Sequence, residues 1–188
     1  MSNLLSYKGD KRLKSALVKE MKHHQEQDQI IRGTYGKTNG KFVACAVGCA
    51  IHSLNLTQKK DWKTSDHSVY EQELGIPIFL SYIEDNIFEA LEPDYAPQFA
   101  VDFLDSIPVG VNLEPVKYKF LKFILEENHK TVSNLKEINA ELKQQVLSAI
   151  DQCMAVMDGA LKSGKINKAA WSAARSAESA AWSAARSA

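Results

Sequence analysis

Apolar positions recur with helical spacing near the start of the chain. The pattern predicts a long first helix that begins after Asp10 and ends at Gly33. Asp10 suits an N-cap, because its side chain can accept a hydrogen bond from a free backbone N–H of the first turn. Gly33 suits the end, because glycine adopts the left-handed conformation that often follows a helix. The residues expected on its inner face are Leu13, Leu17, Met21, His24 and Ile31.

The segment 42–53 is rich in Ala, Gly and Cys. We interpret it as a short buried helix, although Phe42, Val43 and Val47 would also suit a strand. The polar stretch that follows, 54–67, is expected to be an exposed loop. If 42–53 were extended in a sheet, Cys45, Cys49 and His52 would no longer share a helix face, and the glycine-rich loop would no longer precede a helix.

The rest of the chain alternates between helical patterns and Gly or Pro breaks. No convincing series of alternating strands is present, so we predict an all-α fold, a compact bundle of about seven or eight helices. The expected helices are a short one over 68–74 stopped by Gly75, then 77–91, 97–106, 114–128, and one capped by Asn134 or Asn139 that runs to Leu161.

The C-terminal tail contains a repeat. AAWSAARSA occurs at Ala169 and again at Ala180, a period close to three helical turns. Ser163 and Gly164 break the preceding helix, so we predict a globular domain over 1–164 and a repeat helix over 165–188. The helix would serve packing or oligomerisation, unless the tail is an appendage with no fold of its own. The residues expected on one interface stripe are Trp171, Arg175, Trp182 and Arg186. Exposed Trp residues often mark contacts, and we therefore expect a homo-oligomer.

Composition narrows the classes of function. The chain has 188 residues, with 23 basic and 23 acidic side chains. Zero net charge argues against broad electrostatic binding of nucleic acid. The longest apolar run, 42–51, is too short to span a membrane. An odd number of cysteines and no secretory pattern at the N-terminus favour a cytoplasmic protein with reduced thiols.

A glycine-rich loop over 33–41 precedes the small-residue segment. Glycines and lysines before a helix start can bind an anion through backbone N–H groups and charge. Our first hypothesis is therefore a non-enzymatic protein, without a cofactor, that sequesters a small anionic, nucleotide-like ligand; a plain turn is the simpler alternative. The residues assigned to this site are Tyr35, Gly36, Lys37, Gly40, Lys41 and His52.

Cysteine and histidine residues suggest a second hypothesis. Cys45, Cys49 and His52 would share one helix face, with Asp66 and His67 following. One cysteine could act as a nucleophile with a histidine base, or the two thiolates and two imidazoles could bind zinc in a metal-assisted enzyme. Small buried cysteines more often serve packing, so neither a metal nor catalysis is assigned.

Glu84 lies among apolar residues of the helix expected over 77–91. It is either a solvated boundary residue beside Asp85 or a partly buried carboxylate with a raised pKa that could act as a base. Glu84, Asp85 and Glu89 lack the ExxH pattern of a di-iron bundle.

Several short motifs carry a resemblance. The block CAVGC at 45–49, Asp66–His67, LGIP at 74–77, Glu84–Asp85 and IFE at 87–89 resembles a group of small, uncharacterised bacteriophage and bacterial proteins, which also carry tails with repeated Trp, Arg and Ser. The resemblance implies a phage or bacterial cytosolic setting and carries over no catalytic residue. It suggests a third hypothesis, a protein–protein inhibitor of a host factor or an assembly factor.

Overall fold

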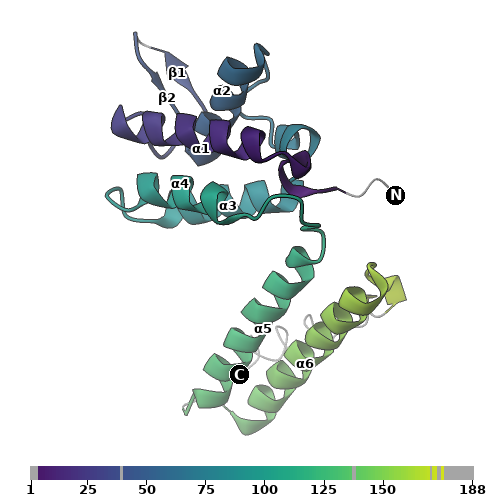
Figure 1. Cartoon of the computed structure of the whole chain (residues 1–188). Helices are drawn as coiled ribbons and strands as arrows, with labels where there is room; N and C mark the ends of the chain where they lie inside the picture. Colours follow the sequence, from purple (N-terminus) through teal and green to yellow (C-terminus); the bar gives the residue numbers. More distant parts are fainter. Residues whose placement is uncertain (1–3, 39, 137–138, 170, 173–174, 176–188) are drawn as a thin grey trace. The chain divides into compact units, whose positions relative to one another are not determined.

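The computed structural model describes residues 4–38, 40–136, 139–169, 171, 172 and 175. Nearly all of its regular structure is α-helical, which confirms the predicted all-α class (Figure 1). The chain divides into two compact units, Met1–Glu114 and Pro115–Ala188, a boundary that the sequence analysis did not place. The division predicted after residue 164 coincides with the end of a helix and stays a prediction as a domain boundary.

The first unit holds most of the secondary structure. It comprises, in chain order, η1 (Ser6–Gly9), α1 (Lys11–Glu26), β1 (Lys37–Thr38), β2 (Phe42–Val43), α2 (Ala46–Gln58), η2 (Tyr70–Leu74), α3 (Ile78–Ala90) and α4 (Ala96–Ser106). Helix α1 packs against α2 and α4, and α3 packs against the same two helices. In Figure 1, α1 and α2 lie above the layer that α3 and α4 form.

Helix α1 begins as predicted, because the Asp10 side chain accepts the N–H of Arg12 at 2.8 Å. Its predicted end at Gly33 is wrong, since the helix stops at Glu26. The chain turns at Asp28, where φ is +52°, and Ile30 then forms a parallel β-bridge with Ala44. Pairing with Ala44 takes the backbone groups that a longer helix would need.

The segment 42–53 contains both of the elements that we considered. Phe42–Val43 is a strand that pairs antiparallel with Lys37–Thr38, and the helix starts only at Ala46. The helical interpretation is therefore confirmed from Ala46 onward. The predicted loop over 54–67 is wrong in its first part, because α2 continues to Gln58 and buries Leu54. Small apolar side chains on every face explain why α2 lies at the centre of the core.

The N-terminus is tied to the end of α4. Ser6 exchanges backbone hydrogen bonds of 2.9 Å with Val111 and Gly110, and the buried Tyr7 hydroxyl donates to the Leu104 carbonyl at 2.5 Å. Gly75 ends η2 as predicted, with φ of +63°. A Cβ at this position would lie 2.0 Å from the Leu5 carbonyl oxygen, so only glycine allows this approach.

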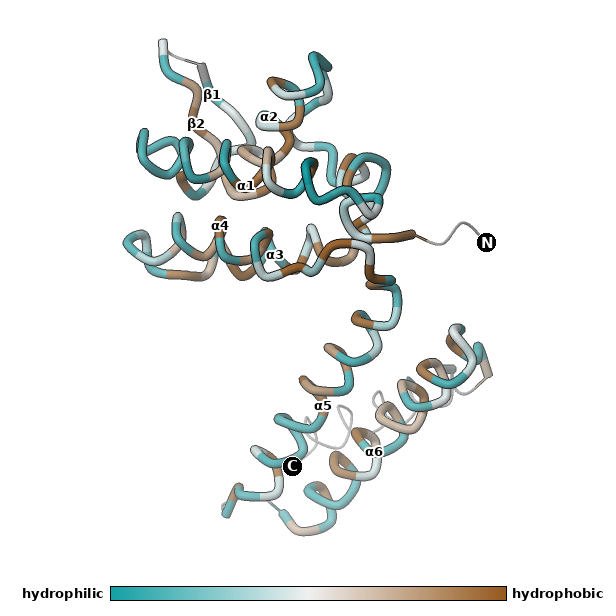
Figure 2. Tube along the Cα trace, viewed as in Figure 1, coloured by the Kyte–Doolittle hydropathy of each residue, from teal (hydrophilic) through white to brown (hydrophobic). Residues whose placement is uncertain are grey.

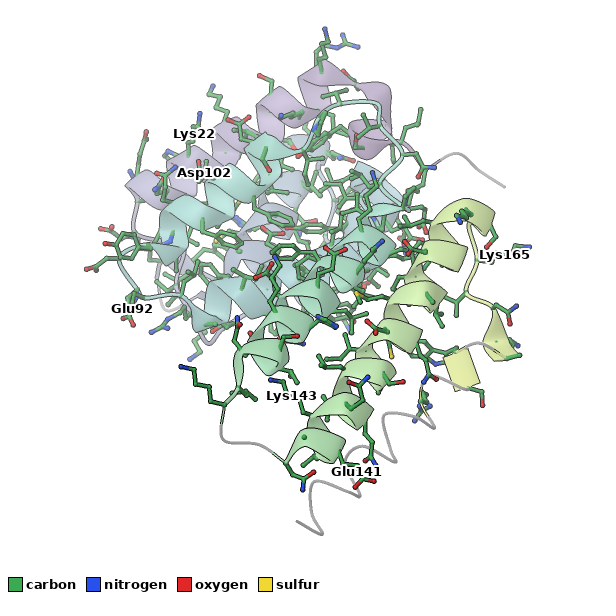
Figure 3. All side chains as sticks on the ribbon, turned by 90° about the horizontal axis from the view of Figure 1, so that it is seen from below. Lys22, Glu92, Asp102, Glu141, Lys143 and Lys165 are labelled. Carbon is green, nitrogen blue, oxygen red and sulfur yellow. The ribbon has the colours of Figure 1, made fainter. Side chains whose placement is uncertain are left out.

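The second unit contains helix α5 (Val116–Asn134) and helix α6 (Ala140–Ser163), which pack against each other. Asn139 caps α6, and Gly164 ends it in the left-handed conformation. The buried core between them is small: Tyr118, Val156, Met157 and Ala160. Figure 2 shows hydrophobic positions along both helices, and in Figure 3 Glu141 and Lys143 mark the first turn of α6.

Only part of the repeat tail is described. The Trp171 N–H donates to the Asn167 carbonyl at 2.9 Å, which is a helical turn, and the Trp171 side chain is 40% exposed. Arg175 is also exposed, whereas Trp182 and Arg186 lie outside the described residues. The proposed interface stripe therefore stays a prediction. Among the described helices, none combines the length and the apolar character that a membrane span requires.

Candidate metal centre

Four potential metal ligands from three segments converge in the first unit. Cys45 is the N-cap of α2, His67 precedes η2, and Asp85 and Glu89 lie on α3. One ligand atom each of Cys45, Asp85 and Glu89 lies within 4.8 Å of the other two. The Nε2 atom of His67 lies 3.8 Å from Oδ2 of Asp85. The cluster thus offers one sulfur, one nitrogen and carboxylate oxygens.

Helix α3 presents both carboxylates on one side because Asp85 and Glu89 are four residues apart. The adjoining face of α3, which includes Leu80, Ser81 and Phe88, is buried in the core. This places Asp85 at the edge of the core, with its side chain 13% exposed, and leaves Glu89 exposed.

Cys45 is fixed in place by its backbone. Its N–H donates to the Thr34 carbonyl at 2.5 Å, and its sulfur accepts the Gly48 N–H at 3.5 Å as the cap of α2. Burial raises the pKa of the thiol well above its usual range. The Gly48 contact opposes this shift, and the charge of Asp85 adds to it. In the absence of a cation the thiol is therefore protonated, which disfavours Cys45 as a free nucleophile.

The imidazole of His67 is held in one tautomer. The Ser81 hydroxyl donates to the Ile78 carbonyl at 2.8 Å, so its oxygen is left to accept from Nδ1 of His67 at 3.0 Å. Nδ1 then carries the proton and Nε2 carries the lone pair. Burial lowers the pKa of His67, so the ring is neutral near pH 7, although Asp85 opposes that shift. Histidines that bind metals usually donate the N–H of the other ring nitrogen to a neighbouring acceptor, as Nδ1 of His67 does to Ser81.

Asp85 has one oxygen satisfied and one not. The Tyr35 hydroxyl donates to Oδ2 at 2.6 Å. Oδ1 is buried and has no hydrogen-bond partner among the described residues. A buried carboxylate oxygen without a partner is costly, and a cation would satisfy it.

The donor set suits a divalent ion of the zinc type. Zinc binds thiolate, imidazole and carboxylate with bonds of about 2.0–2.3 Å, which places its ligands about 3.3–3.8 Å apart in a tetrahedron. Nε2 of His67 lies 3.8 Å from Oδ2 of Asp85, and one donor atom each of Cys45, Asp85 and Glu89 lies within 4.8 Å of the other two. A bound cation would also deprotonate the thiol and offset the repulsion between the two carboxylates.

The structure does not bring the predicted cysteine–histidine set together. Only Cys45 and His67 reach the cluster. The thiol of Cys49 donates to two backbone carbonyls, and burial raises its pKa to about 12. His52 lies elsewhere, stacked on Phe42 with ring centroids 3.8 Å apart.

Two other assigned residues have local structural roles. Asp66 accepts from the N–H and hydroxyl of Ser68 at 3.0 and 2.6 Å. His52 also contacts His24, with 3.3 Å between Nδ1 of His52 and Nε2 of His24. Burial lowers the pKa of both imidazoles.

The glycine-rich loop contributes Tyr35 to the cluster. The other assigned loop residues, Gly36, Lys37, Gly40 and Lys41, are exposed. Gly36, with φ of +149°, directly precedes β1, and Gly40, with φ of +83°, lies between β1 and β2. Anion binding by this loop stays a prediction.

Glu84 is fully buried, so the solvated interpretation is wrong. Its side chain has 0% exposure, and this burial raises its pKa to about 8. The charge of Asp85 adds to the shift, whereas the Tyr70 hydroxyl opposes it. It lies in the core beside Tyr70, and its raised pKa keeps it protonated at neutral pH.

Sequence reasoning missed Asp85, Glu89 and Ser81 as parts of a site. The available signal was the spacing of Asp85 and Glu89 on one helix, which we weighed only against the di-iron pattern. No known protein family, curated protein or solved structure matches the chain. The assignment of a site therefore rests on the geometry.

Proposed function

We propose that the first unit is a metal-binding domain, in which Cys45, His67, Asp85 and Glu89 bind one divalent transition-metal ion of the zinc type. The observation that carries the proposal is the convergence of donor atoms of Cys45, Asp85 and Glu89 within 4.8 Å of one another, with the buried Oδ1 of Asp85 lacking a hydrogen-bond partner among the described residues. A cation at this point would satisfy that oxygen and offset the repulsion between the two carboxylates.

The mixture of ligands distinguishes this cluster from an ordinary acidic surface. Sulfur and imidazole select borderline ions such as zinc over calcium or magnesium, which prefer oxygen alone. Cys45 is 1% exposed and His67 is 6% exposed, so these two ligands are held by the core rather than by flexible surface chains. When bound, such an ion supplies Lewis-acid chemistry and can activate water.

The structure favours this function over cysteine-based hydrolysis. A catalytic cysteine needs a thiolate near neutral pH, whereas burial raises the pKa of the Cys45 thiol. A metal ion removes that difficulty, because a coordinated thiol loses its proton. The same residue is therefore better suited to binding a metal than to attacking a substrate on its own.

Calorimetric titration of the chelator-treated full chain with Zn²⁺ tests the proposal. We expect binding of one equivalent, with release of the thiol proton that makes the heat depend on the buffer. The variant Asp85→Asn should bind much more weakly, since it loses an anionic ligand. The matched control Asp66→Asn should bind nearly like the wild type, because the Asp66 carboxylate hydrogen-bonds Ser68 and is not among the proposed ligands. Equal affinity of the two variants would overturn the proposal.

A further inference from the structure

A three-residue segment of the glycine-rich loop, 33–35, contacts every member of the proposed metal centre. The Gly33 N–H donates to both carboxylate oxygens of Glu89, each at 3.0 Å. The Thr34 carbonyl accepts the Cys45 N–H at 2.5 Å. These two contacts come from the backbone, so they do not depend on the side chains of the segment.

Tyr35 makes the remaining two contacts through its hydroxyl. The hydroxyl donates to Oδ2 of Asp85 at 2.6 Å and lies 3.5 Å from Nε2 of His67. Its hydrogen bond to the Asp85 carboxylate is the main cause that raises the pKa of Tyr35. The phenol is therefore neutral at physiological pH and acts as a donor. Since Oδ2 is held by Tyr35, the buried Oδ1 is the oxygen that remains for a cation.

The backbone of this segment is pressed against α2. A Cβ on Gly48 would lie 2.7 Å from the Tyr35 carbonyl oxygen, so the absence of a side chain at Gly48 permits this approach. Tyr35 is also 40% exposed, which means that burial of its ring does not by itself fix it. Its position depends on the close packing at Gly48 and on the hydrogen bond to Asp85.

We infer that residues 33–35 form a clasp over the metal centre, and that Tyr35 is the positioning residue that orients Asp85 and His67 for the ion. This inference rests on the proposed function. Groups that hold metal ligands by hydrogen bonds strengthen binding by about tenfold to 100-fold. Tyr35 acts through Asp85 and His67, and it is not itself a ligand.

Zinc affinity of the full chain tests the inference with a matched pair of variants. Tyr35→Phe removes only the hydroxyl that holds Asp85. Tyr82→Phe is the control, because Tyr82 contacts His67 only through its ring, stacked at a centroid distance of 4.2 Å. We expect Tyr35→Phe to weaken zinc binding about tenfold to 100-fold, and Tyr82→Phe to leave it unchanged.

A second readout separates positioning from a general structural effect. In the metal-free protein, the nuclear magnetic resonance chemical shifts of the His67 imidazole nitrogens should change in Tyr35→Phe, because the hydroxyl 3.5 Å from Nε2 is removed, whereas those of His129, in the second unit, should not. Wild-type affinity in Tyr35→Phe would overturn the clasp while leaving the metal centre intact. No zinc binding by the wild type would overturn both the metal centre and the clasp.

Discussion

Gly48 lets us predict opposite effects for the same substitution at two helical positions. In Gly48→Ala, the new methyl group would lie 2.7 Å from the Tyr35 carbonyl oxygen and 2.7 Å from Cβ of Ala44. Neither neighbour is the end of a flexible side chain, so the backbone must move. In Gly159→Ala, the methyl group would meet no atom within 4 Å.

The magnitudes follow from two opposing effects. Overpacking a closely packed site costs about 1–3 kcal/mol. Replacing glycine by alanine inside a helix gains about 0.5–1 kcal/mol. At Gly48 both effects apply, and we expect a net loss of about 1 kcal/mol, and at most about 2.5 kcal/mol, in the stability of the first unit. At Gly159 only the gain applies, so the second unit should become more stable by about 0.5–1 kcal/mol.

Hydrogen exchange followed by mass spectrometry is the suitable assay, because it reports each unit separately. Peptides from α2 should exchange faster in Gly48→Ala, and peptides from α6 should exchange more slowly in Gly159→Ala. Unchanged or slower exchange of α2 in Gly48→Ala would refute the reasoning. It would mean that the segment carrying Tyr35 does not approach α2 closely.

Three further predictions concern buried polar groups. The first uses urea unfolding of metal-free protein over a range of pH. As pH rises from about 5 to about 8, the free energy of unfolding of wild type should fall by about 1.4 kcal/mol per pH unit relative to that of Glu84→Gln. The reason is that folding raises the pKa of Glu84 from 4.5 to about 8, so the wild type loses stability as pH rises over that range; parallel pH profiles would contradict this. Thermal unfolding of Tyr7→Phe should reveal a loss of about 1–3 kcal/mol, since the Leu104 carbonyl loses its buried donor, and an unchanged midpoint would argue against that hydrogen bond. In mass-spectrometric alkylation of the metal-free native protein, Cys153, which is half-buried, should react before the buried Cys45; faster reaction of Cys45 would point to an accessible thiolate.

Much of the fold could be predicted from local sequence signals. Asp10 and Asn139 cap helices at the expected places, and Gly75 and Gly164 end them. Each of these signals acts within one or two turns of its own position. The end of α1 could not be predicted in this way, because a partner distant in sequence, Ala44, determines it.

The candidate site was less accessible to sequence reasoning. Cys45 and His67 were recognised from residue type, but their partners on α3 depend on how α2 and α3 pack. His52 follows Cys45 at helical spacing, yet its ring packs against the rings of Phe42 and His24 rather than near Cys45. Chemistry-bearing residues could thus be identified from sequence, whereas their grouping required tertiary contacts.

Cobalt substitution tests the central claim, the metal centre, most directly. One equivalent of Co²⁺ added to the chelator-treated full chain should produce intense visible bands of a tetrahedral ion and a near-ultraviolet sulfur-to-cobalt charge-transfer band. Cys45→Ser should lose the charge-transfer band. Cys49→Ser should keep it, because the Cys49 thiol points to the backbone carbonyls of Gln29 and Ala44. Absence of the band in the wild type, or its persistence in Cys45→Ser, would contradict the account.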